Sequence, residues 1–188
     1  DMSATNEKRT INIDLLEYLS KSCFVPLTVG GGITNVNDVK EVIRAGADKV
    51  SINSSAINNP HLITEIADKF GSQCAVVSMD CSLDDDGIHR VYSNSGKDQT
   101  GLIATEWAKK IEDHGAGEIF LNSIDRNGSK QGYDLNLIKN ITDSVSIPVI
   151  ACGGVGDFKD FAPGIIEGGA SAVAAGNTPT AALTNDVD

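Results

Sequence analysis

Hydrophobic and polar positions along this chain follow two alternating patterns. Short apolar runs rich in Val and Ile lack the polar alternation of a half-exposed strand, so they predict parallel strands covered on both faces. These runs occupy residues 24–29, 48–53, 74–80, 117–123, 147–152 and 171–176. Between them, apolar residues recur at helical spacing, as Val39, Val42 and Ile43 do. Alternating strands and helices predict an α/β fold.

The predicted helix with the clearest ends begins beside Asn59. Asn59 suits an N-cap, Pro60 suits the first turn, and Gly71 suits the C-terminal end of this helix. Pro163 falls inside the last predicted helix and is expected to kink or shorten it. The other helices are predicted over residues 12–20, 37–45, 102–114, 134–143 and 157–167.

One stretch, residues 81–92, interrupts the alternation. It holds an acidic run that ends in a polar turn at Asp86-Gly87, and a β-like run follows. We predict an excursion loop there, with its carboxylates exposed to solvent.

The chain also repeats itself. The segment Val25-Pro-Leu-Thr-Val-Gly-Gly-Gly-Ile33 returns 122 positions later as Ile147-Pro-Val-Ile-Ala-Cys-Gly-Gly-Val155, and a helical stretch and a Gly-Ala pair follow each copy. Glycines at strand ends let backbone N–H groups approach an anion, because no Cβ stands in the way. A single Gly-Gly could simply make a tight turn. The repetition favours function and predicts two anion sites.

Composition and charge narrow the function further. The chain has 188 residues, 40% of them hydrophobic, which suits one well-buried domain. A formal net charge of −11 argues against nucleic acid as a partner and against adhesion to an anionic membrane. No apolar run approaches the roughly 20 residues that a membrane helix needs, and no signal peptide is evident.

Cysteines and histidines indicate neither a disulfide framework nor a metal site. The cysteines are spread apart without C-x-x-C spacing, which predicts reduced thiols in a cytoplasmic protein. The histidines are isolated from one another, so we predict no histidine metal site and expect all of them at the surface. These residues are Cys23, Cys74, Cys81 and Cys152, and His61, His89 and His114.

Two aspartates stand where predicted strands end. Asp80 follows an apolar run, and Asp125 ends the run Glu118-Ile-Phe-Leu-Asn-Ser-Ile124. In parallel α/β folds the chemistry sits at the carboxyl ends of strands, and partial desolvation can raise a carboxyl pKa into the range of a general acid or base. Capping of the next loop is the alternative role. We favour chemistry for Asp80 and weigh the two roles equally for Asp125.

The repeat also bears on where the fold begins. One period before Asp125 lies close to Asp1, whose neighbours could form the end of an earlier strand. About six strands are predicted, against the eight of a closed barrel. We therefore expect the fold to be incomplete at its N-terminus.

These motifs resemble the HisF family, the cyclase subunit of imidazole glycerol phosphate synthase, up to about Asn177. The matching segments include Leu27-Thr-Val-Gly-Gly-Gly-Ile33, Gly46-Ala-Asp-Lys-Val-Ser-Ile-Asn53 and Ser123-Ile-Asp-Arg-Asn-Gly-Ser-Lys-Gln-Gly-Tyr-Asp134. The resemblance implies a (β/α)₈ TIM barrel of two half-barrel repeats, here a single domain over residues 1–188 with N-terminal strands missing. It also implies a substrate with a phosphate at each end, a phosphoribulosyl formimino carboxamide ribotide, and no cofactor.

The resemblance assigns roles by position. Asp80 matches one of two catalytic aspartates that shuttle protons while ammonia attacks the ketose-derived carbon of the substrate. Asp1, Ser95 and Asp125 are possible substrate contacts. One phosphate would be held by Gly32, Asn53 and Ser54, and the other by Asn127, Gly128, Gly154, Ala175 and Gly176.

The resemblance also implies a partner. A glutaminase subunit of the HisH type would dock on the amino-terminal face and send ammonia through the barrel. Lys49 and Glu118 match its charged entrance, and Thr28 and Ser51 would line the passage.

Departures from the family pattern leave two alternatives open. The second catalytic aspartate belongs to a first strand that these residues do not include, so we expect little cyclase activity from the chain alone. Asn127 stands where Asp is usual, and Gly176 where Ser is frequent. These changes are similar to those of HisF-like paralogues that deliver ammonia to a nucleotide-sugar acetamido group. The other alternative is a non-catalytic fragment that binds a glutaminase or associates with itself through exposed strand edges.

Overall fold

A computed structural model describes Ala4, Glu7 and residues 9–176 of the chain. Its centre is a sheet of six parallel strands in the order β1-β2-β3-β6-β7-β8. The strands are β1 (Thr28–Gly30), β2 (Lys49–Ile52), β3 (Ala75–Leu83), β6 (Glu118–Ser123), β7 (Val149–Cys152) and β8 (Ala172–Ala174). All six predicted strands are present, which confirms the α/β class.

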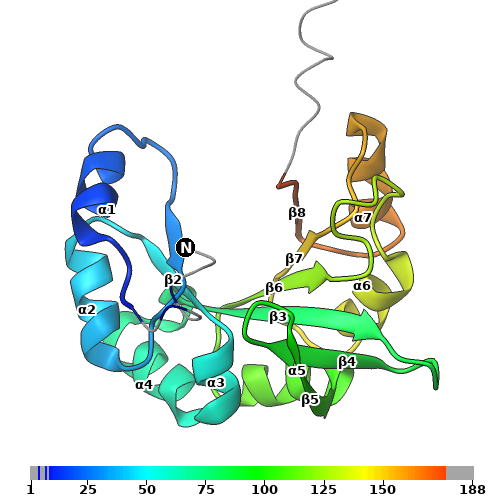
Figure 1. Cartoon of the computed structure of the whole chain (residues 1–188), viewed down its shortest axis with the longest axis horizontal. Coiled ribbons are helices and arrows are strands. Elements are labelled where there is room, and N and C mark those ends of the chain that lie inside the picture. The colour runs from blue at the N-terminus through cyan, green and yellow to red at the C-terminus, as the bar shows by residue number, and fades with distance from the viewer. Residues whose placement is uncertain (1–3, 5–6, 8, 177–188) are drawn as a thin grey trace, which may run out of the picture.

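The parallel sheet curves like part of a barrel. Figure 1 shows β1 and β8 on opposite sides of a cup, with β3 and β6 across its floor. Among the described strands, β1 pairs only with β2 and β8 only with β7, so these strands do not close a ring. The described strands thus form a curved, open part of a barrel rather than a flat sheet.

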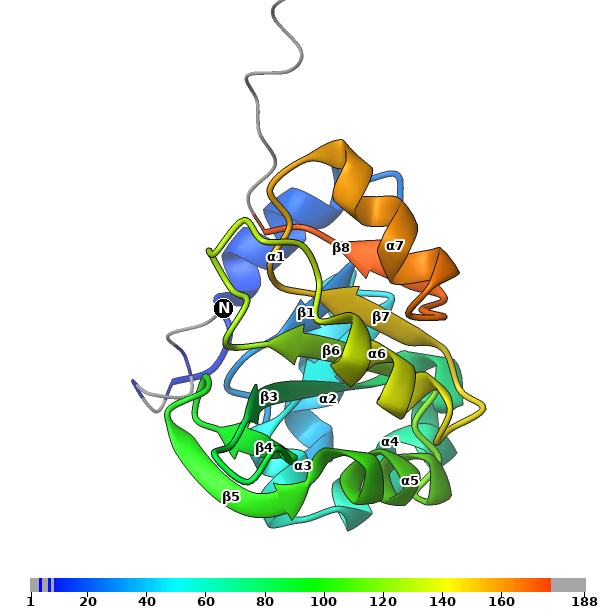
Figure 2. The same ribbon diagram turned by 90° about the vertical axis from the view of Figure 1, so that its right-hand side faces the viewer.

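Helices lie on the outside of the cup (Figure 2). The predicted helices are all present, although their ends differ by a few residues. The helices are α1 (Ile13–Ser20), α2 (Val36–Arg44), α3 (Ser54–Asn58), α4 (His61–Phe70), α5 (Ala104–Asp113), α6 (Leu135–Thr142) and α7 (Phe161–Ile166), with short 3₁₀ turns η1 (Ser72–Cys74) and η2 (Phe158–Asp160).

Local sequence signals explain several helix ends. Asn35 caps α2 through a capping box with Asp38. Gly71 ends α4 with φ of 89°, as the sequence predicts. The predicted start of α4 is wrong by one residue, because the N-cap is Pro60 rather than Asn59 and no side chain caps this end. Pro163 falls in the first turn of a helix that is only six residues long and follows the separate turn η2. The predicted shortening of that helix is confirmed.

The excursion after β3 is a β-hairpin that joins the same sheet by pairing with β3. β3 runs on past Asp80 to Leu83, and β4 (His89–Ser93) pairs with it antiparallel. β5 (Asp98–Ile103), which the sequence did not predict as a strand, pairs with β4. The excursion is therefore more ordered than the predicted loop, because β4 hydrogen-bonds to the extended part of β3.

Burial separates the two faces of each strand. On β3 and β6, Val77, Met79, Ile119 and Leu121 are buried against the helix layer. The alternating positions Ser78, Asp80, Phe120 and Asn122 are half-buried and line a cavity. The prediction that both faces are covered is therefore wrong for the inner face, because that face of the open sheet borders the cavity.

His89 also departs from the sequence prediction. It was expected at the surface, yet only 8% of its surface is exposed to solvent. Its Nε2 lies 3.2 Å from Asp134 Oδ2, and Asp134 also caps α6 by accepting from Leu137 N. Although burial alone raises the pKa of Asp134, its hydrogen bonds from His89 and Leu137 hold the pKa below its usual value. This contact fastens the start of β4 to α6.

Candidate active site

A cavity of about 1250 Å³ occupies the inside of the cup and gathers most of the predicted site residues. It is lined from strand ends and loops that are far apart in the sequence. The predicted residues that line it are Gly32, Ser51, Asn53, Ser54, Asp80, Ser95, Asn127, Gly128, Gly154, Ala175 and Gly176. Asp1 lies outside the described residues.

The two repeated glycine turns stand at different walls of this cavity. Gly32 follows β1 with φ of 68°, and Gly154 follows β7 with φ of 103°. A Cβ on Gly32 would lie 2.3 Å from Arg9 O, and one on Gly154 would lie 2.1 Å from Gly132 O. Both positions need glycine for the backbone angle and for the close approach of another chain segment.

Three segments converge at the second turn. Gly132 N donates to Gly154 O at 2.8 Å, which ties the loop after β6 to the turn after β7. Tyr133 donates its hydroxyl proton to Ala174 O at 3.0 Å, which ties the same loop to the end of β8. Burial raises the pKa of Tyr133 to about 12, so the hydroxyl stays a donor at neutral pH. Asn127, Gly128, Ala175 and Gly176 are thereby brought to one side of the cavity.

The predicted residues of the first phosphate site are tied to the hairpin. Asn53 donates from Nδ2 to Ser78 O at 3.1 Å and to Tyr92 O at 3.2 Å. Ser54 Oγ accepts from Asn94 N at 2.9 Å. Asn94 and Ser95 both have left-handed backbone conformations, with φ of 51° and 59°. The β4–β5 connection is therefore anchored at the rim, where Ser95 lines the cavity.

Asp80 lies on the cavity side of β3 with two amide neighbours. Asn122 Nδ2 donates to Asp80 Oδ1 at 2.8 Å, and Asn53 Nδ2 lies 3.5 Å from Asp80 Oδ2. Burial raises the pKa of Asp80 above its ordinary value, and the hydrogen bond from Asn122 acts in the opposite direction. A carboxyl group with a raised pKa inside a cavity is suited to exchange protons with a ligand.

Asp125 has a different environment. Its Oδ1 accepts from Ser82 Oγ at 2.6 Å and its Oδ2 accepts from Leu83 N at 2.8 Å. In the described residues it is exposed and does not contribute to the cavity lining. Both of its oxygens therefore hold the end of β3, which is distant in sequence, rather than the loop that follows Asp125 itself.

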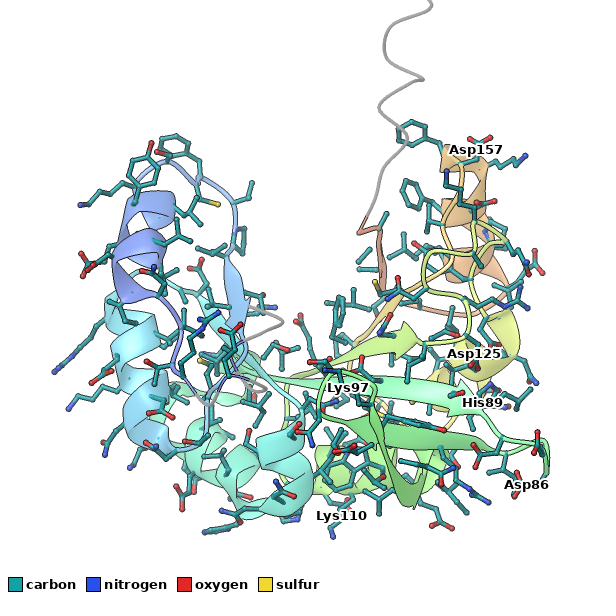
Figure 3. The ribbon with its side chains drawn as sticks, in the orientation of Figure 1. Asp86, His89, Lys97, Lys110, Asp125 and Asp157 are labelled. Carbon is teal, nitrogen blue, oxygen red and sulfur yellow. The ribbon has the colours of Figure 1, made fainter. Side chains whose placement is uncertain are left out.

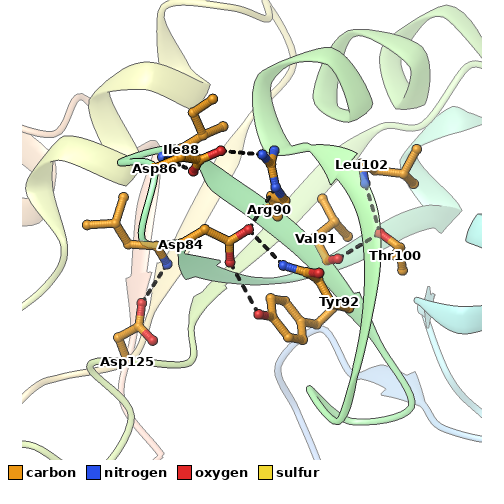
Figure 4. A network of polar contacts seen from close by, with 11 residues as sticks. Asp84, Asp86, Ile88, Arg90, Val91, Tyr92, Thr100, Leu102 and Asp125 are labelled. Atoms are coloured by element: carbon orange, nitrogen blue, oxygen red, sulfur yellow. Dashed lines mark hydrogen bonds and ion pairs between the residues drawn. The ribbon is translucent and has the colours of Figure 1, made fainter.

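The antiparallel strands that pair with the end of β3 carry a network of charged contacts (Figure 4). Arg90 pairs with Asp84 at 2.7 Å and with Asp86 at 2.5 Å, and Gln99 donates to Asp84 at 2.7 Å. In Figure 3, Asp86 lies at the outer end of the hairpin, whereas Lys97 lies toward the middle of the molecule. The acidic run of the excursion is therefore mostly paired with hairpin residues rather than simply solvated.

The predicted ammonia-entrance residues meet at the other end of the sheet. Lys49 begins β2, Glu118 begins β6, and their Nζ and Oε1 atoms are 2.5 Å apart. Both side chains are largely buried, at 26% and 19% exposed. Ser51 lines the cavity above this pair, while Thr28 is exposed at the start of β1.

Sequence reasoning missed several residues of the cavity wall. Asn122, Cys152, Arg9 and Lys130 line it beside the predicted residues. Asn122 and Cys152 could have been found from strand alternation, because they are the inward positions two residues beyond Phe120 and Ile150. Arg9 and Lys130 come from loops, for which no periodicity applies. Burial raises the pKa of Cys152, so its thiol is neutral at ordinary pH.

The described residues hold neither a cluster of metal ligands nor a membrane-spanning helix. Within residues 9–176, Ala4 and Glu7, no group of three or more His, Cys, Asp or Glu side chains could hold a metal ion. Over the same described part of the chain, no helix has both the length and the apolar character to cross a membrane.

Comparison with known proteins agrees with this geometry. Residues 1–179 match the family described as "Histidine biosynthesis protein". The chain is 50% identical over 175 residues to "Imidazole glycerol phosphate synthase subunit HisF" of Alkaliphilus metalliredigens (strain QYMF), a match that covers 93% of this chain and 69% of that protein. The chain belongs to the HisF family. The resemblance inferred from its motifs is confirmed, and so is the TIM-barrel family to which its parallel sheet belongs.

Within the HisF family fold, the cavity lies where chemistry is expected. Asn122 and Cys152 lie near the carboxyl ends of β6 and β7, the end at which barrel enzymes build their sites. Asp80 is level with them as the register partner of Asn122, although β3 continues beyond it to Leu83. The Lys49–Glu118 pair stands at the opposite, amino-terminal end.

Proposed function

We propose that this HisF family member is the cyclase subunit of imidazole glycerol phosphate synthase in histidine biosynthesis. It would use ammonia to convert a phosphoribulosyl formimino carboxamide ribotide into imidazole glycerol phosphate and aminoimidazole carboxamide ribotide. The observation that carries the proposal is that Asp80 and both repeated glycine turns line one cavity. A substrate with a phosphate at each end would need two anion sites with a proton-transfer group between them.

The cavity supplies the anion sites without a cluster of lysines. Backbone groups at glycine-rich turns can bind phosphate, which fits a chain with a formal net charge of −11. We propose that Gly32, Asn53 and Ser54 hold one phosphate. The segment of Asn127 and Gly128, with Gly154, Ala175 and Gly176, would hold the other.

Asp80 would carry protons during ring closure and cleavage. Burial raises its pKa above the ordinary value, which favours a carboxyl group that can both accept and return a proton. Its position on β3, between the turns after β1 and β7 in the strand order, supports contact with the middle of the substrate.

Ammonia would reach the cavity from the amino-terminal face. The half-buried Lys49–Glu118 pair supports an entrance there, and Ser51 continues the path toward the cavity. We propose that a glutaminase of the HisH type docks on this face. A single barrel domain would then carry ammonia from the partner at its amino-terminal face to the substrate in the cavity.

Turnover of the ribotide with an ammonium salt tests the proposal, using the protein expressed from its complete reading frame. We expect turnover in the parent and a severe loss of turnover in Asp80→Asn, while both bind inorganic phosphate equally in calorimetry. Asp125→Asn makes the same isosteric change at the other strand-end aspartate and serves as the control. Undiminished turnover by Asp80→Asn would refute the catalytic assignment.

A folded, phosphate-binding parent that turns over no ribotide would favour the second candidate. Asn127 and Gly176 both line the cavity wall and are the departures that motivate a nucleotide-sugar amidating activity. In that case the barrel and the ammonia path would serve a different acceptor.

A further inference from the structure

The two oxygens of the Asp80 carboxyl group have unequal partners. Oδ1 accepts a hydrogen bond of 2.8 Å from Asn122 Nδ2. Among the described residues, Oδ2 has only the 3.5 Å contact with Asn53 Nδ2, whose shorter hydrogen bonds go to Ser78 O and Tyr92 O. The carboxyl group is thus held firmly on one side and weakly on the other.

The register of the strands and the direction of the Asn122 amide create this asymmetry. Asp80, Asn122 and Cys152 are register partners on the adjacent strands β3, β6 and β7, so their side chains form one row across the cavity floor. Asn122 Oδ1 points to the turn after β7, where a Cβ on Gly153 would come within 3.2 Å of it. With its oxygen on that side, the amide presents its nitrogen to Asp80.

We propose that Asn122 is a positioning residue that holds Oδ1 of Asp80 and thereby makes Oδ2 the oxygen that exchanges the proton. An amide NH₂ group can only donate, so it opposes a proton on the oxygen that it contacts and remains bonded in both protonation states. The proton then enters and leaves on Oδ2. This role rests on the proposed function of Asp80 as a proton carrier and names the residue that orients it.

Other polar groups near Asp80 are less suited to orient its carboxyl group. Tyr92 is its register partner on β4, but the Tyr92 hydroxyl lies 3.5 Å from Asp84 Oδ1. The thiols of Cys81 and Cys152 have pKa values raised by burial, and the Asp80 charge adds to both shifts. Arg9 and Lys130 line the same cavity from loops. The hydrogen bond from Asn122 is the contact that lowers the Asp80 pKa against burial.

The test is a pH titration of the Asp80 carboxyl carbon by ¹³C NMR in the full-length protein. The Asp80 signal is assigned by its loss in Asp80→Asn. In Asn122→Leu, which keeps the side-chain size but removes the donor, we expect the titration midpoint to move up. In the parent, the Asn122 side-chain NH₂ signal should titrate with the same midpoint as Asp80.

The kinetic counterpart is the pH profile of kcat. For Asn122→Leu we expect kcat at neutral pH to fall about 10- to 100-fold, the range of a lost hydrogen bond to a charged group, with KM within about threefold. The acid limb should move up together with the NMR midpoint. A merely structural role would lower activity without moving either midpoint.

Two further variants keep the proposal falsifiable. Asn140→Leu removes a matched amide donor that serves Asn136 on the exposed face of α6, and it should change neither readout. Asn122→Asp keeps the shape if the leucine variant fails to fold, and its carboxyl should couple to Asp80 and split the titration into two steps. An unchanged midpoint in Asn122→Leu, or a single unshifted step in Asn122→Asp, would overturn the proposal. Because the titration needs no turnover, it stands or falls separately from the proposed reaction.

Discussion

Asp80 and Asp125 both follow apolar strands, yet the structure gives them opposite environments. Asp80 faces the cavity, where burial raises its pKa and one amide holds a single oxygen. Asp125 is exposed and has both oxygens bonded, to Ser82 Oγ and Leu83 N. A carboxylate with hydrogen bonds to both oxygens holds a neighbouring segment in place, here the end of β3. One with a free side inside a cavity can take part in chemistry. The position of an aspartate at a strand end therefore does not decide its role.

The largest expected effect contrasts the two isosteric variants. Asp80→Asn should lower kcat by about 10²- to 10⁴-fold, the usual contribution of a general acid or base. Asp125→Asn should lower kcat less than about tenfold, because it keeps one acceptor and lies outside the proton path. Steady-state kinetics with ammonium at saturating ribotide measures both. Equal losses in the two variants would erase the distinction between them.

A second contrast concerns stability. Asp125→Ala should lower the free energy of unfolding by about 1 kcal/mol, because Ser82 Oγ and Leu83 N lose their acceptor. Urea unfolding followed by circular dichroism measures the change, and Ser82→Ala, which removes one of the two bonds, should have a smaller effect. If Asp125→Ala is as stable as the parent, the fastening role is wrong.

The smallest effect is in the pH dependence of stability. The raised pKa of Asp80 means that the native state binds its proton more tightly than the unfolded chain does. That stabilisation is present below the unfolded pKa and is lost as the pH rises through the folded pKa. Asp80→Asn should therefore be more stable than the parent at pH 7, by less than about 1 kcal/mol, and equal to it near pH 3. Urea titrations at the two pH values check this, and a gain at pH 3 as large as that at pH 7 would contradict it.

Much of the fold could be predicted because its signals are local. Six apolar runs and the helical spacing between them depend on near neighbours in the sequence, and so does the glycine that ends α4. The strand β5 and the short helix α3 were not predicted. β5 is polar along most of its length and is extended because β4 pairs with it, a contact that no local pattern records.

The candidate site was predictable where the repeat marked it. The glycine turns of Gly32 and Gly154 were visible as two copies of one motif, and both line the cavity. Asn122 and the buried His89 were not, because each depends on a partner distant in sequence. The Asn122 amide acquires its role only when register places it opposite Asp80.

The sequence by itself determined the alternation of strands and helices, the two glycine turns and the presence of carboxylates at strand ends, since each depends on residue type and spacing along the chain. Only the tertiary structure decided which face of the sheet borders the cavity and which aspartate lines it. The physical reason is that a carboxyl group's pKa and orientation depend on burial and on donors, and the donors come from distant segments: Asn122 lies 42 residues from Asp80, and Ser82 lies 43 from Asp125.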